Sequence, residues 1–549
     1  MIIKLKDERF ILENTLKTDF GIPQYVLDAY SESQLAVVQE RIKRNPWSCY
    51  DKENGFGINL CKKIADKLDF NNDYEKCKAY IQYAIDKVAD QGHCYAKEWQ
   101  INQVLSPEKF TDYDKQRALD FLTKENILYV APSGNYYLDR YYLYEKTFAQ
   151  LLNTLGKKNG KKTGFKKHKC ESYYQLNDNQ RKAVDAVETN SLIILTGLPG
   201  TGKTTTIKAI VDCYSAYNDN IKLFAPTGKA ASRMMEMCNV PAFTLHSWFS
   251  PVIPSEARCQ CVENSIIILD ELSMCDVEIA AYFAQAVQED CVLILVGDPD
   301  QLPSVGPGQI LQDVLDSEVG TRYHLNQIMR QKPGSIIKTA HSIHSGNYLV
   351  CDDDKELLTY HPKEWNLESI VSQILKHPEW KDAQFLSVLR EKGSVIVNNL
   401  VQQTLHPHNI HKFRVGDKVI HTKNNKELGV FNGEMGKVVK VGQFVYVQFR
   451  DKLIPYPHHM TWQLDLAYCI TIHKSQGSEF DKVVLFVTPS QITTRNLLYT
   501  GITRAKQRAL IVSPSSEVVK QAIANKQKPR QTSMSWLIKK GVDRGITVE

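Results

Sequence analysis

The residues from Leu192 to Thr206 read LIILTGLPGTGKTTT and contain the spacing G-x-x-x-x-G-K-[ST] in Gly197, Gly202, Lys203 and Thr204. Glycines allow backbone N–H groups to curl around an anion, and the helix start that follows adds its positive dipole end. Lys203 should reach the β and γ phosphates of a nucleotide, and the Thr204 hydroxyl should bind Mg²⁺. The alternative is an ordinary glycine turn, which the preceding apolar strand pattern makes less favourable.

Two acidic residues, Asp270 and Glu271, follow the apolar run Ile266–Leu269. Beside a phosphate loop, Asp270 would hold Mg²⁺ through water, and Glu271 would orient and deprotonate an attacking water molecule. Gln301 lies in the polar turn that ends the next apolar run, and its amide is suited to sensing the γ-phosphate. The alternatives are a solvated acid pair and a capping turn.

Two arginines farther along the chain, Arg330 in LNQIMRQ and Arg504 in YTGITRAK, could offset the charge that develops on the γ-phosphate. If two domains enclose one ATP, these arginines must come from the second domain. Either arginine alone would more often form a surface salt bridge, so their assignment depends on the whole set of motifs.

The elements that would position these residues are alternating strands and helices. The runs IILT, KLFAPT, SIIILDE and VLILVGD each precede turn residues and a helical stretch, which indicates a parallel sheet with helices on both faces. Functional residues belong at the carboxyl ends of such strands. A second cycle begins near Tyr323 and ends with the apolar runs DKVVLFV and RALIVS. It is interrupted at 412–458 by short β-rich segments with glycine turns, which predict a small inserted barrel.

The region before residue 155 is predicted to be mostly helical. Leu60–Leu68 places apolar residues at helical spacing after a Gly-Phe-Gly turn. This pattern fits either a helix-hairpin-helix that holds a nucleic-acid backbone or an ordinary helical packing domain. The lysine-rich run Lys157–Lys169 predicts a basic linker, with phosphate contact or targeting as the alternative role.

Composition restricts the protein class only weakly. The chain has 549 residues, 43% of them hydrophobic and 24% charged, and a net charge of +6, which permits nucleic-acid binding without requiring it. Its 13 scattered cysteines indicate reduced thiols in a cytosolic setting. No apolar run approaches the length of a membrane span, so the chain is expected to be soluble and cytoplasmic.

The order of motifs resembles that of a superfamily 1 helicase, most closely the RecD-like group. The motifs over about residues 174 to 515 are LNDNQRKA, the phosphate loop, APTGKAA, TLHSW, LDELS, GDPDQLPSVGPG, IMRQ, VFNGEMGKV, TIHKSQGSEF and YTGITRAK. The segments NPW, GFGINLCKKIADKL and GHCYAKEWQI also resemble the helical domain of the longer RecD relatives.

The resemblance implies an α/β fold with two RecA-like P-loop NTPase domains, an SH3-like small β-barrel insertion and an N-terminal, mostly helical domain. The implied boundaries are 1–155 for the helical, helix-hairpin-helix-like domain, 156–173 for the linker, 174–322 for the first motor domain with a short hairpin at 249–263, 323–411 and 459–549 for the second motor domain, and 412–458 for the barrel.

The resemblance also implies site residues by position. Gln180 should contact the adenine edge, and Thr204 and Asp270 should bind Mg²⁺. The residues implied for hydrolysis are Lys203, Asp270, Glu271, Gln301, Arg330 and Arg504. The other residues implied for ATP binding are Gly197, Pro199, Gly200, Thr201, Gly202, Lys203, Thr204, Thr205, Gly477 and Glu479. The residues implied for DNA binding are Pro226, Thr227, Lys229, His246, Thr471, His473 and Ser475.

The implied activity is an ATP- and Mg²⁺-dependent DNA helicase that moves 5′ to 3′ on single-stranded DNA and unwinds tailed duplexes. Replication or recombination proteins are the implied candidate partners. The chain between Phe249 and Glu263 is short where this family places a wedge hairpin, so a DNA-stimulated ATPase that translocates without strand separation stays open. An RNA helicase and an ATP-gated binding module acting through residues 1–155 are further alternatives.

Overall fold

The computed structural model describes residues 2–159, 170–215, 220–249, 261–327, 334–348, 356–407, 412–423, 425, 428–450 and 452–541. Arg330 lies outside the described residues, as do most of the expected hairpin at 249–263 and most of the basic linker. Within the described part, no helix is both long enough and apolar enough to cross a membrane.

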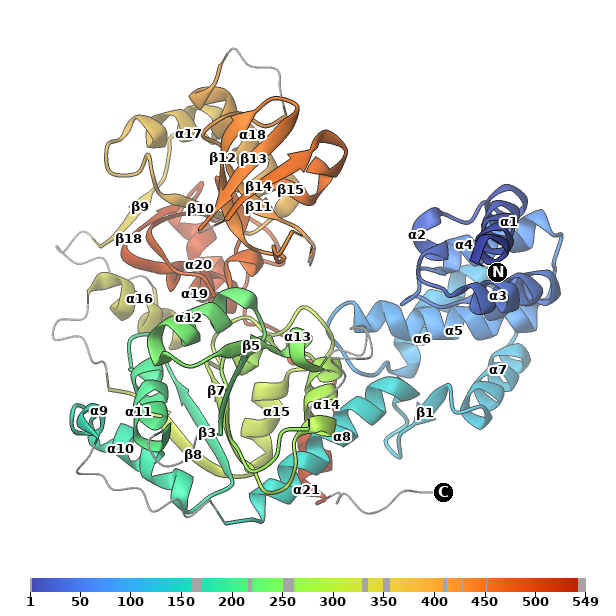
Figure 1. Ribbon diagram of the computed structural model, residues 1–549, viewed down its shortest axis with the longest axis horizontal. Helices are drawn as coiled ribbons and strands as arrows, with labels where there is room; N and C mark the ends of the chain where they lie inside the picture. The colour runs from blue at the N-terminus through green and yellow to red at the C-terminus, as the bar shows by residue number, and fades with distance from the viewer. Residues whose placement is uncertain are drawn as a thin grey trace.

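The first motor unit is a parallel sheet with strand order β5-β4-β6-β7-β3-β8 (Figure 1). Its strands are fully buried at the centre, which explains their continuous runs of Ile, Leu and Val. The strands are β3 (Leu192–Gly197), β4 (Ile221–Ala225), β5 (Ala242–Thr244), β6 (Ile266–Leu269), β7 (Val292–Gly297) and β8 (Thr321–Leu325). The helices are α9 (Glu171–Tyr174), α10 (Asp178–Asp185), α11 (Lys203–Ser215), α12 (Gly228–Cys238), α13 (Leu245–Phe249), α14 (Val277–Ala286) and α15 (Ile310–Ser317).

The second motor unit repeats this architecture with strand order β16-β10-β17-β18-β9, again parallel. The strands are β9 (Leu357–Tyr360), β10 (Gln384–Ser387), β16 (Cys469–Thr471), β17 (Phe480–Phe486) and β18 (Ala505–Val512). The helices are α16 (Ser335–His344), α17 (Leu367–Lys376), α18 (Ile396–Leu405), α19 (Arg495–Ile502) and α20 (Ser516–Ala524). The two α/β units predicted from the sequence are therefore confirmed.

An antiparallel sheet with strand order β14-β13-β12-β11-β15 is inserted between β10 and β16. Its strands are β11 (Lys418–His421), β12 (Met435–Val441), β13 (Phe444–Phe449), β14 (Lys452–Pro457) and β15 (Leu464–Leu466). Val438, Val447 and Tyr456 fill its small core together with Leu464. Because β15 pairs with β11, the insertion extends beyond the expected end at residue 458.

The N-terminal domain is mostly helical and has a core of its own. Its helices are α1 (Ile2–Phe20), α2 (Gln24–Leu27), α3 (Glu32–Arg44), α4 (Ile58–Lys67), α5 (Asp73–Ala89), α6 (Glu98–Leu105) and α7 (Asp112–Lys124). A hairpin of β1 (Leu128–Val130) and β2 (Tyr136–Leu138) follows. Gly55 adopts a φ of +84° before α4, so the turn predicted at Gly-Phe-Gly is present.

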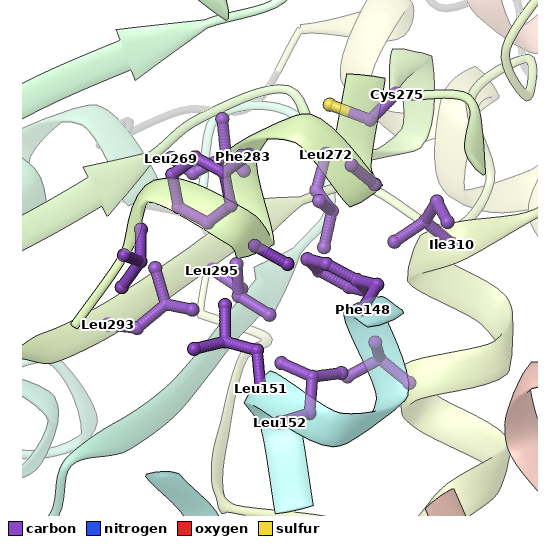
Figure 2. Packing of buried hydrophobic residues seen from close by; sticks show 14 of the residues in the cluster. Phe148, Leu151, Leu152, Leu269, Leu272, Cys275, Phe283, Leu293, Leu295 and Ile310 are labelled. Carbon is purple, nitrogen blue, oxygen red and sulfur yellow. The ribbon is translucent and has the colours of Figure 1, made fainter. Parts of the chain in front are cut away.

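Two helices pack on a different unit from the one expected. Helix α8 (Asp139–Gly156) places Phe148, Leu151 and Leu152 against Leu293 and Phe283 of the first motor unit (Figure 2). Helix α21 (Met534–Lys539) joins the same core, although it follows the second unit in sequence. These two helices lie almost entirely within the expected ranges 1–155 and 459–549, yet both pack on the first motor unit. The expected boundary at 322 falls inside β8.

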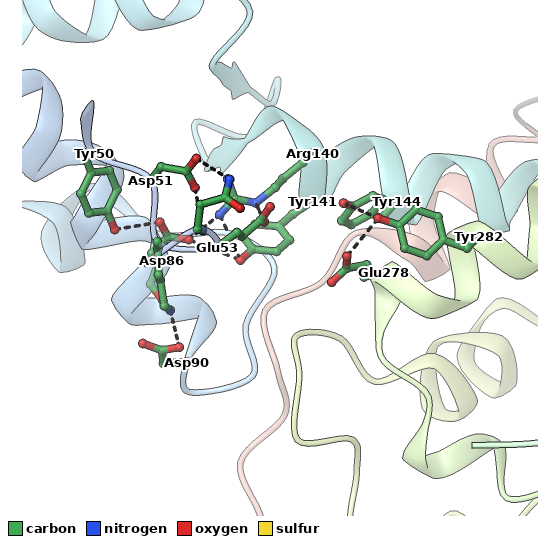
Figure 3. A network of polar contacts seen from close by, with 12 residues as sticks. Tyr50, Asp51, Glu53, Asp86, Asp90, Arg140, Tyr141, Tyr144, Glu278 and Tyr282 are labelled. Atoms are coloured by element: carbon green, nitrogen blue, oxygen red, sulfur yellow. Dashed lines mark hydrogen bonds and ion pairs between the residues drawn. The ribbon is translucent and has the colours of Figure 1, made fainter. Parts of the chain in front are cut away.

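Polar contacts hold the N-terminal domain to α8 (Figure 3). Arg140 Nη2 lies 2.7 Å from Asp86 Oδ1, and Arg140 Nε lies 2.9 Å from Glu53 Oε1. Farther along α8, the Tyr144 and Tyr282 hydroxyls lie 3.5 Å apart, which connects the helix to α14. Helix α8 is thus a shared layer between the N-terminal domain and the first motor unit.

One cysteine pair differs from the expectation of reduced thiols. Cys170 and Cys213 are joined as a disulfide between the start of α9 and α11, with their Cα atoms 5.5 Å apart. Both residues are buried in the core of the first motor unit.

Candidate functional site at the junction of the motor units

The phosphate loop connects β3 to α11 with a backbone that only glycine adopts easily. Gly200 and Gly202 have φ values of +77° and +83°, in the left-handed region. A Cβ atom on Gly197 would lie 2.7 Å from the Leu325 carbonyl oxygen, because β8 packs directly beside β3. The sequence spacing therefore reflects both turn geometry and close packing.

Lys203 is the first residue of α11, so its side chain begins at the positive end of the helix dipole. Its Nζ donates hydrogen bonds to the carbonyl oxygens of Gly197 and Leu198, the latter at 3.3 Å. The ammonium group thus lies over the loop, where phosphate oxygens would replace these carbonyl groups.

Asp270 and Glu271 directly follow β6, at the carboxyl edge of the sheet as predicted. Glu271 has a φ of +54°, and its backbone N–H donates to Asp270 Oδ1 at 2.8 Å. Burial, and then the neighbouring Asp270 carboxylate, raises the pKa of Glu271 to about 7. This carboxyl group is therefore more basic than an exposed glutamate.

A cavity of about 390 Å³ brings most of the predicted nucleotide residues together. It is lined by Leu198, Pro199, Gly200, Gly202, Lys203, Thr204, Thr205, Arg233, Asp270, Glu271, Gly297, Asp298, Gln301, Glu479, Thr503 and Arg504. Glu479, Thr503 and Arg504 belong to the second unit, whereas the other lining residues belong to the first. Arg504 is nearly buried and donates to the carbonyl oxygens of Thr500 and Ser478.

The loop after β7 contacts both the cavity and the second motor unit. Gln301 is 7% exposed; its Nε2 lies 3.4 Å from Asp298 Oδ2, and its Oε1 finds no hydrogen-bond partner among the described residues. The Tyr499 hydroxyl donates to the same Asp298 oxygen at 2.9 Å. The Leu302 backbone N–H donates to Thr500 Oγ1 at 3.1 Å. This loop can therefore connect the nucleotide site to α19.

Four residues predicted to bind ATP do not line the cavity: Gln180, Gly197, Thr201 and Gly477. Gln180 is fully buried, and its amide donates to the carbonyl oxygen of Thr201 at 3.2 Å, beneath the loop. Thr201 is also buried and donates to the Leu198 carbonyl oxygen. Gly477 instead faces α12, where an added Cβ would lie 2.8 Å from Thr227 Oγ1. Gln180 and Thr201 therefore support the phosphate loop from below. Gly477 lies at the contact between the two motor units.

The predicted DNA-binding residues divide into exposed and enclosed groups. His246 and His473 are exposed, and Pro226, Thr227 and Thr471 are half-exposed. Ser475 was expected to contact DNA, but it is fully buried and donates to the Ile472 carbonyl oxygen at 2.7 Å. Its hydroxyl therefore does not reach the surface.

Lys229 also differs from the expected exposed contact. Its Nζ donates to Ser478 Oγ at 3.0 Å across the two motor units. Burial, followed by the nearby Arg450, lowers the pKa of Lys229 to about 8. A DNA contact by this ammonium group would require the interdomain hydrogen bond to be exchanged.

Sequence reasoning missed two interdomain residues. Arg233 on α12 forms a 2.7 Å ion pair with Glu479, and both side chains line the cavity. Asp298, the acid at the carboxyl end of β7, binds Tyr499 as well as Gln301. The position of Asp298 at a strand end was an available signal, whereas nothing local distinguishes Arg233 from a surface arginine.

The donor set of the cavity fits a nucleoside triphosphate with Mg²⁺. The glycine loop supplies backbone N–H groups, Lys203 and Arg504 supply positive charge, and Thr204 and Asp270 supply the oxygen ligands that Mg²⁺ prefers. The described residues contain no cluster of three or more His, Cys, Asp or Glu that could hold a metal ion. In nucleotide sites of this kind, Mg²⁺ binds phosphate oxygens and water in addition to one or two protein ligands.

Family models match four parts of the chain. These are the ATP-dependent RecD2 DNA helicase HHH domain at residues 14–95, an AAA domain at 175–357, the ATP-dependent RecD-like DNA helicase SH3 domain at 397–450 and the UvrD-like helicase C-terminal domain at 466–512. The matches follow the helical domain, the first motor unit, the barrel and the last strands of the second unit.

Two curated relatives match the chain over longer stretches. The ATP-dependent RecD2 DNA helicase of Deinococcus radiodurans is 30% identical over 374 residues, covering 65% of this chain. The chain spans about half the length of that relative, 52%. The RecBCD enzyme subunit RecD of Mycolicibacterium smegmatis is 27% identical over 455 residues, covering 72% of this chain and 81% of the relative.

Among solved structures, the Pif1 helicase from Bacteroides in complex with ADP-AlF3 and ssDNA is 22% identical, with a TM-score of 0.42, covering 63% of this chain and 94% of that one. Along this chain, the helical-domain match comes first, followed by the AAA match, the SH3 match and the UvrD-like C-terminal match. In its helical, barrel and motor domains, the chain is therefore similar to the RecD-like DNA helicases of superfamily 1.

Proposed function

We propose that this protein is an ATP-driven motor that moves 5′ to 3′ along single-stranded DNA and unwinds tailed duplex DNA. The observation that supports the proposal most directly is the shared cavity. Lys203 and Glu271 of the first unit and Arg504 of the second unit line the same space, so one nucleotide would contact both units.

Within this proposal, each residue of the cavity has a separate role. Lys203 binds the β and γ phosphates, Glu271 accepts the proton of the attacking water, and Arg504 offsets charge on the γ-phosphoryl group. Mg²⁺, held by Thr204 and Asp270, would supply further positive charge to the phosphates. Arg330 remains a second candidate for the role of Arg504.

Motion would follow from the contacts that cross the junction. Asp298, Leu302 and Lys229 of the first unit bond to Tyr499, Thr500 and Ser478 of the second. ATP would draw the units together, and product release would let them separate. DNA held alternately at Thr227 and Thr471 would then advance in one direction, through contacts that carry no sequence information.

The test is strand separation of forked duplexes that carry only a 5′ or only a 3′ single-stranded tail, with ATP and Mg²⁺, alongside the ATPase rate. We expect unwinding of the 5′-tailed substrate alone and ATP hydrolysis stimulated more by single-stranded DNA than by RNA. A matched Lys203→Ala variant should abolish both activities, because the loop loses its phosphate-binding cation.

Other outcomes would select other functions. DNA-stimulated hydrolysis without strand separation on either tail would replace the helicase with a translocase. Unwinding from the 3′ tail would overturn the direction, and stronger stimulation by RNA would overturn the substrate. Cellular function that survives loss of hydrolysis would favour the ATP-gated binding module.

A further inference from the structure

The segment at residues 525–533, here named the C-terminal strap, leaves the second motor unit after α20 and returns to the first unit at α21 (Figure 1). Near its end, Thr532 Oγ1 donates to Asp313 on α15 at 2.8 Å. The Ser533 N–H donates to both carboxylate oxygens of Glu145 on α8 at 3.1 Å. The strap therefore ties the second unit to two helices that pack on the first.

Arg530 in the strap binds one loop with both Nη atoms of its guanidinium group. Nη1 donates to Ser304 Oγ at 3.0 Å and to the carbonyl oxygens of Gly306 and Gly308 at 2.8 and 2.6 Å. Nη2 donates to the Ser304 carbonyl oxygen at 2.6 Å. A planar guanidinium fork can satisfy several fixed acceptors at once, which a lysine ammonium cannot do in the same geometry.

This loop directly continues the nucleotide-sensing segment. Ser304 lies three residues after Gln301, and the backbone between them contacts the second unit through Leu302. Side chains in the described part of the chain hold the Gln301 amide only weakly, because its Nε2 lies 3.4 Å from Asp298 and its Oε1 has no hydrogen-bond partner there. The place of Gln301 in the cavity therefore depends on how the backbone on either side is held.

The N-terminal domain reaches the same point. An added Cβ on Gly92 would lie 2.3 Å from Arg530 Cζ, so the guanidinium packs directly on this glycine. The Gly308 N–H donates to the Gly92 carbonyl oxygen at 2.9 Å, and the Gln531 N–H donates to His93 Nδ1 at 2.9 Å. The C-terminal strap, the loop at residues 303–309 and the N-terminal domain thus meet around the side chain of Arg530.

We propose that Arg530 is a positioning residue for ATP hydrolysis: by clamping the loop at residues 303–309, it fixes Gln301 against the γ-phosphate and couples that position to the N-terminal domain at Gly92. This inference rests on the proposed ATPase function. Arg530 does not line the nucleotide cavity, so it acts through the loop and not on the substrate.

The main test compares Arg530→Gln and Arg530→Lys with the wild-type full chain, using Lys526→Gln on the exposed part of the strap as control. Steady-state ATPase assays with single-stranded DNA should show kcat for Arg530→Gln reduced about tenfold to a hundredfold. KM for ATP should change less than about threefold, because the phosphate loop is untouched. The kcat of Arg530→Lys should lie between those of Arg530→Gln and wild type. The kcat of Lys526→Gln should match that of wild type.

A second variant approaches the clamp from the N-terminal domain. Gly92→Ala should displace the guanidinium and lower kcat as Arg530→Gln does. Gly92 has a φ of +91°, so the matched control is Gly134→Ala in the same domain, where φ is +76° and an added Cβ meets no atom within 4 Å. That control carries similar backbone strain without the contact.

Hydrogen exchange provides a readout that does not depend on activity. Amides of residues 304–309 should lose protection in Arg530→Gln and Gly92→Ala, while those of β3 keep theirs. Unchanged kcat with unchanged exchange would overturn the proposal, and so would equal losses of kcat, ATP affinity and protection throughout the first unit. If wild type hydrolyses no ATP, the proposed function fails, whereas the exchange result still decides whether Arg530 holds the loop.

Discussion

Tyr499 of the second motor unit donates a hydrogen bond from its hydroxyl to Asp298 Oδ2 of the first unit at 2.9 Å. Asp298 is 1% exposed, and burial raises the pKa of the Tyr499 hydroxyl well above its usual value, so the hydroxyl stays a donor. Because Asp298 also contacts Gln301, this bond connects the nucleotide cavity to α19 through a single carboxylate.

Replacement of Tyr499 by Phe should weaken the junction without opening a cavity. The variant removes one donor from a buried carboxylate, which should cost about 1.5 to 3 kcal/mol of stability. It should also reduce the stimulation of ATP hydrolysis by single-stranded DNA more than the basal rate. Thermal unfolding and ATPase assays check both effects, with Tyr113→Phe at an exposed position as control. Equal stimulation in both variants would contradict the role of the bond.

The variant Glu271→Gln should separate nucleotide binding from hydrolysis. The amide cannot accept the proton of water, so kcat should fall about 10² to 10⁴-fold. Affinity for a fluorescent ATP analogue should remain within about threefold, because Lys203 and the glycine loop are unchanged. Glu368→Gln, an exposed position on α17, is the control. Retained turnover in Glu271→Gln would exclude this residue as the base.

The phosphate loop and the acid pair could be predicted because each depends on local order in the sequence. A buried strand, a loop and a helix start fix the place of Lys203, and a strand end fixes that of Asp270. The alternation of apolar strands and helices likewise predicted both α/β units, because parallel strands buried on both faces leave an apolar run that a sequence displays directly.

Contacts between distant segments could not be predicted in this way. Tyr499 and Asp298 are 201 residues apart, and their types alone do not indicate a pair. Helix α8 has an apolar face that fits any neighbour, so its packing on the first motor unit followed only from the assembled fold. Gln180 was assigned by position, but the structure uses its amide to support the loop.

Arg140 should prove important for the attachment of the N-terminal domain. Arg140→Met leaves Asp86, which is 2% exposed, without its 2.7 Å ion-pair partner. We expect the free energy of local opening to fall by about 3 kcal/mol, because an unpaired charge remains buried. Amide exchange in α5 measures this loss. The double variant Arg140→Met/Asp86→Asn should recover part of it, and no recovery would mean that the charge is not the cause.

Glu145 should make the stability of the whole junction depend on pH. Burial, and then the nearby Asp313 carboxylate, raises the pKa of Glu145 from 4.5 to about 8. The folded state therefore holds a proton that the unfolded state has released between these values. The contribution of Glu145 to the free energy of unfolding should be greatest below about pH 4.5. It should fall as the pH rises toward 8.

The matched variant Glu145→Gln keeps an acceptor for the Ser533 N–H but cannot ionise. Denaturant unfolding between pH 5 and 9 should show wild type losing stability on the order of a few kcal/mol, and the variant losing less. Some pH dependence should persist, because burial also raises the pKa of Asp313 to about 7. Parallel curves for the two proteins would mean that Glu145 is ionised in the folded state, and that Ser533 and Tyr137 stabilise the carboxylate more than burial disfavours it.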